Sequence, residues 1–307
     1  MIQTVLLTLL GVTVPLSIPV IAGMLLKKYQ NLDTKPLLTL YLYFLTPALI
    51  LDSLSKAKLS YGDVFQTLAF SVLNLLLLWA AAWGIGKGMK LSAPETAGLT
   101  LISTFTNSVN YGLPLVLLAF GQMGLDKASV YVIAQMLIVN TVGVYFAARS
   151  HFSVRQAIRS VFALPAIYAA VFAMLLRALD LQLPVGIAKG ISMVAAAYAP
   201  VVLALLGAQM MSVSRHKLEG EERRTFGLGM AVRSLLSPVI ALAGLTLLGI
   251  EGILFNVLFI LASMPVAVNA VVLAERYDAS PKIVSACILW STLLSFVILP
   301  VYIVWVQ

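Results

Sequence analysis

The sequence predicts an all-α polytopic membrane protein, on the strength of its composition, its hydropathy and the spacing of its apolar runs. Of its 307 residues, 61% are hydrophobic and only 10% are charged, and the mean hydropathy is +1.01. Soluble domains carry about 25% charged residues. We count ten apolar runs, and about 20 apolar residues are enough for a helix to cross the hydrocarbon core of a bilayer. Ten transmembrane helices joined by short loops are therefore expected.

The ten runs follow one another along the whole chain. The first five are Val5 to Leu26, Leu37 to Leu54, Val64 to Gly86, Thr96 to Phe120 and Ser129 to Ala148. The second five are Val161 to Leu179, Val185 to Met211, Phe226 to Leu248, Ile253 to Ala274 and Ile283 to Trp305. The longest connection, about 212–225, is rich in charge and predicts a solvated loop.

Basic residues predict how these helices are oriented. Short loops that carry Lys and Arg stay on the cytoplasmic side of a membrane. The odd-numbered loops hold fourteen of these residues, and the even-numbered loops with their flanking helix ends hold five. The odd loops are thus expected in the cytoplasm, with both termini outside a plasma membrane. The net charge of +8 lies in these loops and not in a basic domain, so nucleic-acid binding is not expected.

Proline spacing indicates an internal repeat. Pro47 and Pro114 are 67 positions apart, and Pro200 and Pro265 are 65 positions apart. In each half of the chain, the first proline of the pair follows a small residue in the second of the five spans. The other proline interrupts the fourth of the five spans, close to an amide. Because each half has five spans, an odd number, the second copy must enter the membrane inverted. We expect one repeat in 1–150 and the other in 151–307.

The stretch S-T-F-T-N-S-V-N-Y-G-L-P-L interrupts the fourth span with polar residues. It holds Asn107 and Asn110, followed by Gly112 and Pro114. Proline lacks an N–H and clashes with the carbonyl four residues back, so the helix should kink or open near Asn110 and resume near Leu113 and Pro114. Opened backbone in a membrane is tolerated only where it is buried in protein or lines a wet cavity. The pattern therefore predicts a solute site at mid-membrane.

The stretch T-N-S-V-N-Y-G-L-P-L and the C-terminal stretch A-S-M-P-V-A-V-N-A-V-V-L-A-E-R-Y-D resemble the auxin efflux carrier family, which includes plant auxin carriers and bacterial organic-acid permeases. The resemblance implies ten helices in two inverted five-helix repeats, as in bile-acid sodium symporters, with helices four and nine broken and crossing. It also implies a scaffold of helices 1, 2, 6 and 7, and a transport domain of helices 3–5 and 8–10 that slides as an elevator. A homodimer through the scaffold, in the inner membrane of a bacterium, belongs to the same expectation.

Carried over residue by residue, the resemblance places the crossover amides at Asn107 and Asn269, and the crossover prolines at Pro114 and Pro265. Plant members lack an asparagine at the second amide, so auxin itself is not the favoured substrate. They also carry a long hydrophilic loop after helix five, where this chain has only the short basic connector 150–159.

The polar interruption, the proline spacing and the resemblance together indicate the candidate solute-binding residues. They are Asn107, Asn110, Asn269, Thr46 and Arg233, and the helix-breaking residues are Gly112, Pro114 and Pro265. Amides supply donors and acceptors without a charge to desolvate, and the start of a half-helix favours an anion. The amides have a plainer alternative role, which is to hydrogen-bond the broken backbone. Thr46 also has one, which is to hydrogen-bond a carbonyl of its own helix. Arg233 could pair with a solute or with Glu275, or its long stem could reach the cytoplasmic face.

These features predict a carrier of small organic anions, auxin-like molecules or mono- or dicarboxylates, that works without a cofactor or a metal. Few acids lie in the spans, so an uncoupled or potential-driven carrier needs fewer parts than the alternative, a sodium- or proton-coupled symporter. A channel is a further alternative, because channels also use broken helices. No hydrolase, zinc-protease or phosphate-binding motif occurs, and His151 and His216 fall in loops, so an enzyme is not expected. The single cysteine, Cys287, allows no internal disulfide.

Overall fold

The computed structural model describes residues 2–57, 60–143, 146, 155, 159, 162–212 and 218–307, and every named element in this part of the chain is helical. Seven of the described helices are long and apolar enough to cross a membrane, and two shorter apolar helices accompany them. The expectation of an all-α, multi-pass membrane protein is therefore confirmed. The expected repeat boundary between 150 and 151, and both histidines, lie outside the described residues.

The first half of the chain folds into long helices that contain short π-helical turns. In order these are α1 (Ile2–Thr8), η1 (Leu9–Thr13), α2 (Val14–Gln30), α3 (Thr34–Leu40), η2 (Tyr41–Leu45), α4 (Thr46–Lys56), α5 (Tyr61–Gly88), α6 (Ala93–Thr104), η3 (Ser108–Gly112), α7 (Leu113–Ile138) and η4 (Val139–Gly143). The backbone of Gly121 is not helical, with φ 65° and ψ −161°, so α7 consists of two helices joined there.

The described part of the second half has the same character. Its helices are α10 (Pro165–Ala178), α11 (Val185–Ala196), α12 (Tyr198–Ser212), α13 (Gly220–Ala231), η6 (Val232–Leu236), α14 (Ser237–Leu247), α15 (Gly252–Ala262), α16 (Ala270–Tyr277) and α17 (Pro281–Val306). Of the charged loop expected at 212–225, residues 213–217 lie outside the described part of the chain, and from Gly220 onward the segment is helical.

Four of the π-helical turns end two residues before a proline. The turns η1, η2, η3 and η6 are each followed by an α-helix whose second residue is proline. A proline ring clashes with the carbonyl four residues back and leaves it without a donor. A wider π turn gives that carbonyl room, which is one of the known ways in which helices accommodate such a defect. The spans therefore pass these prolines without breaking.

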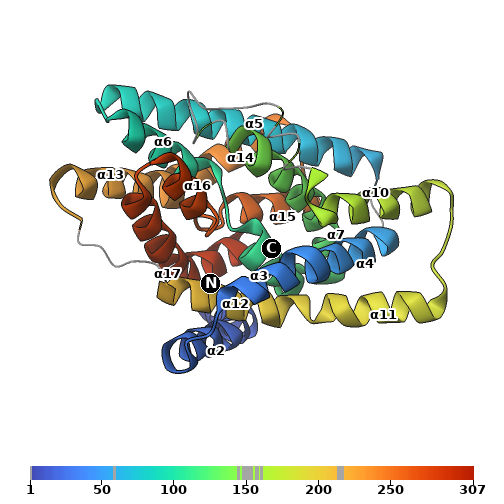
Figure 1. Ribbon diagram of the computed structural model, residues 1–307. Coiled ribbons are helices and arrows are strands. Elements are labelled where there is room, and N and C mark those ends of the chain that lie inside the picture. The colour runs from blue at the N-terminus through green and yellow to red at the C-terminus, as the bar shows by residue number, and fades with distance from the viewer. Residues whose placement is uncertain are drawn as a thin grey trace.

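Two glycines let α2 and α12 touch along their backbones. A Cβ at Gly23 would overlap the carbonyl oxygen of Ala204, and a Cβ at Gly207 would overlap that of Val20. Lipid tails are as apolar as leucine, so membrane helices associate by such close contacts between small residues. The two helices accordingly lie side by side at one edge of the molecule (Figure 1).

Two helices break completely, and their broken segments cross. Helix α6 ends at Thr104 and α15 ends at Ala262, while α16 does not begin until Ala270. Between these ends, Thr106 and Val266 form an isolated antiparallel bridge. The Asn107 N–H donates to the Pro265 carbonyl at 2.8 Å, and the Ala267 N–H donates to the Phe105 carbonyl at 2.9 Å. The opened backbone thus finds its hydrogen bonds in the other broken helix, as a low-dielectric environment requires.

The first break lies earlier in the chain than the sequence suggested. It falls at 105–107, about two turns before Pro114, which lies in the first turn of α7 directly after η3. The helix is distorted near Asn110, as predicted, because the π turn η3 contains this residue, and α7 begins at Leu113. The complete break, however, lies earlier than predicted, because the π turn relieves the proline. Pro265, by contrast, lies inside the second break. Gly112 has a packing role, since a Cβ there would meet Leu261 Cδ2 at 2.6 Å.

Candidate functional site

A cavity of about 370 Å³ lies beside the crossing. Its walls come from four parts of the chain, within 38–42, 105–110, 135–140 and 267–273, together with Leu164. Most of the lining is apolar, and none of the described residues that line it carries a formal charge. The cavity has the size and the apolar character of small-molecule sites, in which a few polar groups set the orientation of the ligand.

Asn107 is the first of the predicted amides at this cavity. It directly precedes η3, is 3% exposed, and its carbonyl accepts hydrogen bonds from the N–H groups of Tyr111 at 3.3 Å and Gly112 at 3.0 Å. The backbone N–H and carbonyl of Asn107 therefore already have hydrogen-bond partners. Its side-chain Nδ2, however, has no hydrogen-bond partner among the described residues, so it remains a buried donor.

Asn110 lines the same cavity one turn further along η3. Its side chain is 3% exposed, and its Oδ1 has no partner in the described part of the chain, and neither does the neighbouring Ser108 Oγ. Leaving a buried polar atom unpaired costs about 1–3 kcal/mol. Three such atoms on one short segment are costly unless something else binds them, so this segment is the clearest candidate for contact with a solute.

Asn269 reaches the cavity from the second break, where it is the residue before α16. Its side chain is hydrogen-bonded to that of Tyr41 in η2. Tyr41 is 2% exposed, and its ring lies 6.4 Å from that of Tyr198. The three amides expected on two different spans thus lie around one cavity, and an aromatic residue that the sequence analysis did not select holds one of them.

Two helical segments begin at this cavity. The turn η3 starts at Ser108 and α16 starts at Ala270, and both residues are among those that line it. The start of a helix carries about +0.5 of an elementary charge, so two of them supply roughly one positive charge without a basic side chain. This arrangement favours a solute with a single negative charge.

Further amides at this cavity, Gln135 and Asn140, were missed by the sequence analysis. The Asn140 side chain donates to the Met136 carbonyl on its own helix at 2.8 Å. A signal was available for both, since two amides five positions apart in an otherwise apolar run are unusual. Prolines mark the breaks in the sequence, whereas no proline marks the helical segment 135–140 that faces them.

Two other predicted site residues do not line this cavity. Thr46 donates its hydroxyl to the Tyr41 carbonyl at 2.8 Å, which is the local bond that membrane threonines often make. Arg233 is buried elsewhere at the crossing, where it bonds backbone carbonyls, and within the described part of the chain it forms no ion pair with Glu275. Among the described residues no group of three or more His, Cys, Asp or Glu side chains is placed to hold a metal ion.

Comparison with known proteins identifies the family of this chain. The family model described as a membrane transport protein matches residues 13–303. The chain belongs to the auxin efflux carrier family. It is accordingly a multi-pass membrane transporter and not an enzyme.

Relatives of this auxin efflux carrier family member come from archaea and plants. It is 29% identical to an uncharacterized transporter of Methanothermobacter thermautotrophicus over 83% of either chain. It is 26% identical to an uncharacterized transporter of Methanocaldococcus jannaschii, over 87% of this chain and 88% of the relative. Auxin efflux carrier component 1 of Arabidopsis thaliana is 28% identical over 40% of this chain and 20% of its own length.

Proposed function

We propose that this protein carries small organic anions, and that the solute binds in the cavity beside the crossing. The observation that carries the proposal is the convergence of two helix starts and five amides on a cavity whose described lining residues are uncharged. About one unit of positive charge favours a monocarboxylate over a dicarboxylate. The apolar walls favour an auxin-like molecule, with an organic body behind its carboxylate, over an inorganic anion.

The proposal includes a fold of ten membrane helices in two inverted five-helix repeats, 1–150 and 151–307. Symmetric packing supports it. The contact of α2 in the first span with α12 in the seventh has its counterpart in the contact of α4 in the second with α10 in the sixth. The contact of α5 with α6 likewise has its counterpart in the contact of α14 with α15. Two crossing helix breaks are what an inverted-repeat transporter requires.

An elevator movement is the mechanism we propose for this fold. Helices 1, 2, 6 and 7 would form the scaffold, and helices 3–5 and 8–10 would form the transport domain. The cavity has walls from both, with Tyr41 on the scaffold side and Asn107 and Asn269 on the other. The Tyr198 hydroxyl also donates across this boundary, to the Val109 carbonyl at 3.0 Å. Sliding of the crossing past the scaffold would therefore open the cavity.

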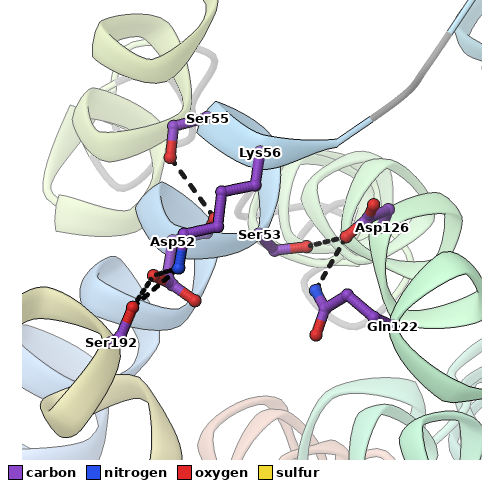
Figure 2. Close-up of polar contacts among 7 residues, drawn as sticks. All are labelled: Asp52, Ser53, Ser55, Lys56, Gln122, Asp126 and Ser192. Carbon is purple, nitrogen blue, oxygen red and sulfur yellow. Dashed lines mark hydrogen bonds and ion pairs between the residues drawn. The ribbon is translucent and has the colours of Figure 1, made fainter. Parts of the chain in front are cut away.

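Helix α4 carries polar contacts on both of its sides, as Figure 2 shows. Asp52 faces α11 on the scaffold side, where it accepts a hydrogen bond from Ser192. Ser53 faces α7, where it donates to the Asp126 carboxylate at 3.1 Å, and Asp126 also accepts from Gln122 at 2.9 Å. The first contact lies within the proposed scaffold and would persist. The second joins the scaffold to the transport domain and would break during the movement.

We also propose a plasma-membrane location with both termini outside, in the bacterial inner membrane, and a homodimer through the scaffold. The Lys and Arg asymmetry supports the orientation, and the family resemblance supports the dimer. A sodium- or proton-coupled symporter of the same fold is the second candidate. The uncharged cavity lining favours the uncoupled carrier, because a coupling site usually has a carboxylate.

Purified protein in liposomes provides the test. Uptake of labelled monocarboxylates and dicarboxylates should saturate, should follow an imposed membrane potential, and should show counterflow when the vesicles hold unlabelled solute. Steady currents without counterflow would indicate a channel, and accumulation that requires a sodium or proton gradient would indicate the symporter. Asn74→Ala serves as the control for cavity variants, since Asn74 is an equally buried asparagine in α5 that does not line the cavity.

A further inference from the structure

Arg233 lies at the crossing of the broken helices but not in the lining of the solute cavity. It belongs to the π turn η6 and is 2% exposed. Its Nη1 donates to the Ser103 carbonyl at 3.1 Å, and its Nη2 donates to the Ala262 carbonyl and to Ser237 Oγ. Ser103 is the residue before the last in α6, and Ala262 is the last residue in α15. One guanidinium therefore joins the ends of both broken helices.

The charge at this point balances. The last carbonyls of a helix have no intrahelical donor and carry about −0.5 of an elementary charge. Two such ends sum to roughly −1, which the guanidinium neutralises. No carboxylate in the described part of the chain forms an ion pair with Arg233. The ionisable side chains that act on it electrostatically, Tyr131 and Tyr302, are phenols and uncharged at pH 7.

The same oxygens would otherwise suit an inorganic cation. Carbonyl and hydroxyl oxygens are the ligands that hard cations prefer, and half-helix C-terminal ends with unwound carbonyls hold coupling cations in some transporters. Here a side chain of the protein fills that position. The guanidinium is planar, keeps its charge and offers five donors in a fixed geometry, so it can satisfy several carbonyls at once.

We infer that Arg233 is a built-in counter-cation for the two broken helices, and that it makes a transported coupling cation unnecessary. The inference rests on the proposed carrier function and adds how that carrier is coupled. Because the positive charge is covalently attached, it stays in the protein when the solute leaves. Each transported anion then moves a net negative charge, and flux should respond to membrane potential and not to a sodium gradient.

Three substitutions separate charge from packing. Arg233→Met keeps much of the volume without charge, Arg233→Lys keeps the charge, and Arg233→Ala leaves room for a guanidinium ion. Arg223→Ala is the control, because Arg223 is exposed on the same continuous helix.

We expect Arg233→Met to lower liposome uptake by about tenfold or more, since two buried helix ends lose a charged donor, and Arg233→Lys to retain more activity. Millimolar guanidinium on both sides of the membrane should restore Arg233→Ala and leave Arg223→Ala unchanged.

A second readout does not depend on transport. In detergent, millimolar guanidinium should raise the thermal unfolding temperature of Arg233→Ala and not that of the wild type or Arg223→Ala. Failure of the wild type to transport any organic anion would reject the proposed function while this binding test still stands. Wild-type rates in Arg233→Met, absence of any guanidinium effect on Arg233→Ala, or accumulation by the wild type that requires sodium would each overturn the inference.

Discussion

The two sides of the crossing contain opposite ends of the same broken helices, and the protein treats them differently. On one side α6 and α15 end, and Arg233 bonds to the carbonyls of Ser103 and Ala262. On the other side η3 and α16 begin, and the amide atoms of Asn107 and Asn110 have no partner among the described residues. The negative ends are therefore satisfied by the chain itself.

This difference indicates which side is available to a ligand. Buried polar groups are normally hydrogen-bonded, and exceptions need an explanation. On the filled side a fixed cation matches the charge of the two helix ends, although Arg233 Nε and Ser263 Oγ there have no hydrogen-bond partner among the described residues. The side with unpaired amides and the starts of two helical segments adjoins a cavity of about 370 Å³, and an anionic solute would satisfy both its hydrogen bonds and its charge. Four changes test the contrast, in order of expected effect.

Asn107→Ala should have the largest effect on transport. It removes a buried donor beside the start of η3, and a hydrogen bond to a charged solute contributes about 1.5–3 kcal/mol. We expect the apparent affinity to fall roughly 10- to 100-fold, measured as uptake of the preferred labelled acid into liposomes. Thermal unfolding should change little, and Asn74→Ala should transport like the wild type. Equal uptake by Asn107→Ala and Asn74→Ala would remove Asn107 from the site.

Gly112→Ala should have a smaller effect, through the geometry of the crossing. The added Cβ would meet Leu261 Cδ2 at 2.6 Å and Met264 Cγ at 3.4 Å, so η3 and α15 would have to separate slightly. The nearest atom is the end of a flexible side chain, so we expect a cost of about 1 kcal/mol and uptake reduced about fivefold. Gly84→Ala is the control, because a Cβ at Gly84 meets no atom within 4 Å. Matching unfolding temperatures and uptake for the two variants would contradict the packing role of Gly112.

The sequence was sufficient to predict three of the five amides that line the cavity. Asn107, Asn110 and Asn269 stand out because an amide in an apolar run must have a partner or a function. The sequence did not locate the first break, because Pro114 marks where a π turn is needed and not where the helix ends. The break at 105–107 depends on hydrogen bonds to 265–267 in the other half of the chain, and such pairing over a long sequence distance leaves no local signal.

Arg233 illustrates a second limit of the sequence. Its position inside a span correctly marked it as unusual, and a solute or Glu275 was the expected partner because both carry negative charge. Its actual partners are backbone carbonyls, which every residue has and no sequence pattern distinguishes. Tyr41 was missed for a related reason, since its hydrogen bond with Asn269 joins the second span to the ninth.

Ser53→Ala tests the contact that would hold the crossing in its present position against the scaffold. It removes the hydrogen bond to Asp126 and also a contact with Ser129 Oγ at 3.0 Å. We expect this conformation to lose about 1 kcal/mol relative to others, a three- to fivefold change in population. Spin labels on the exposed faces of α5 and α11 would report the change as an altered distance distribution.

The control for that change lies two residues away. Ser55 donates only to the Asp52 carbonyl of its own helix, at 3.3 Å (Figure 2). Ser55→Ala should therefore leave the distance distribution as it is in the wild type. A shift of the same size in both variants would show that α4 was perturbed locally and that the Ser53 contact does not hold the two parts together.

The smallest expected effect concerns Glu95, at the other end of α6 from Arg233. Glu95 accepts hydrogen bonds from Ser92 in a capping box and from Thr225 of α13 at 2.8 Å. Partial burial alone would raise the pKa of this carboxyl, but these hydrogen bonds and nearby Arg224 hold the pKa below its ordinary value of 4.5. A lowered pKa means that the carboxylate stabilises the fold in full above about pH 4.5, and that this contribution is lost as pH falls through the lower folded value.

Acidification from pH 6 to below 4 should lower the unfolding temperature of the wild type. In Glu95→Gln this decrease should be smaller by about one or two degrees. Glu251 precedes the other broken helix, α15, but its side chain makes no capping hydrogen bond. Glu251→Gln therefore removes no capping bond and should leave the unfolding temperature at pH 6 as it is in the wild type. Equal responses in the two variants would mean that the charge of a carboxylate near a helix start acts without the capping bonds. The two broken helices would then differ only at the crossing, where one arginine bonds to both.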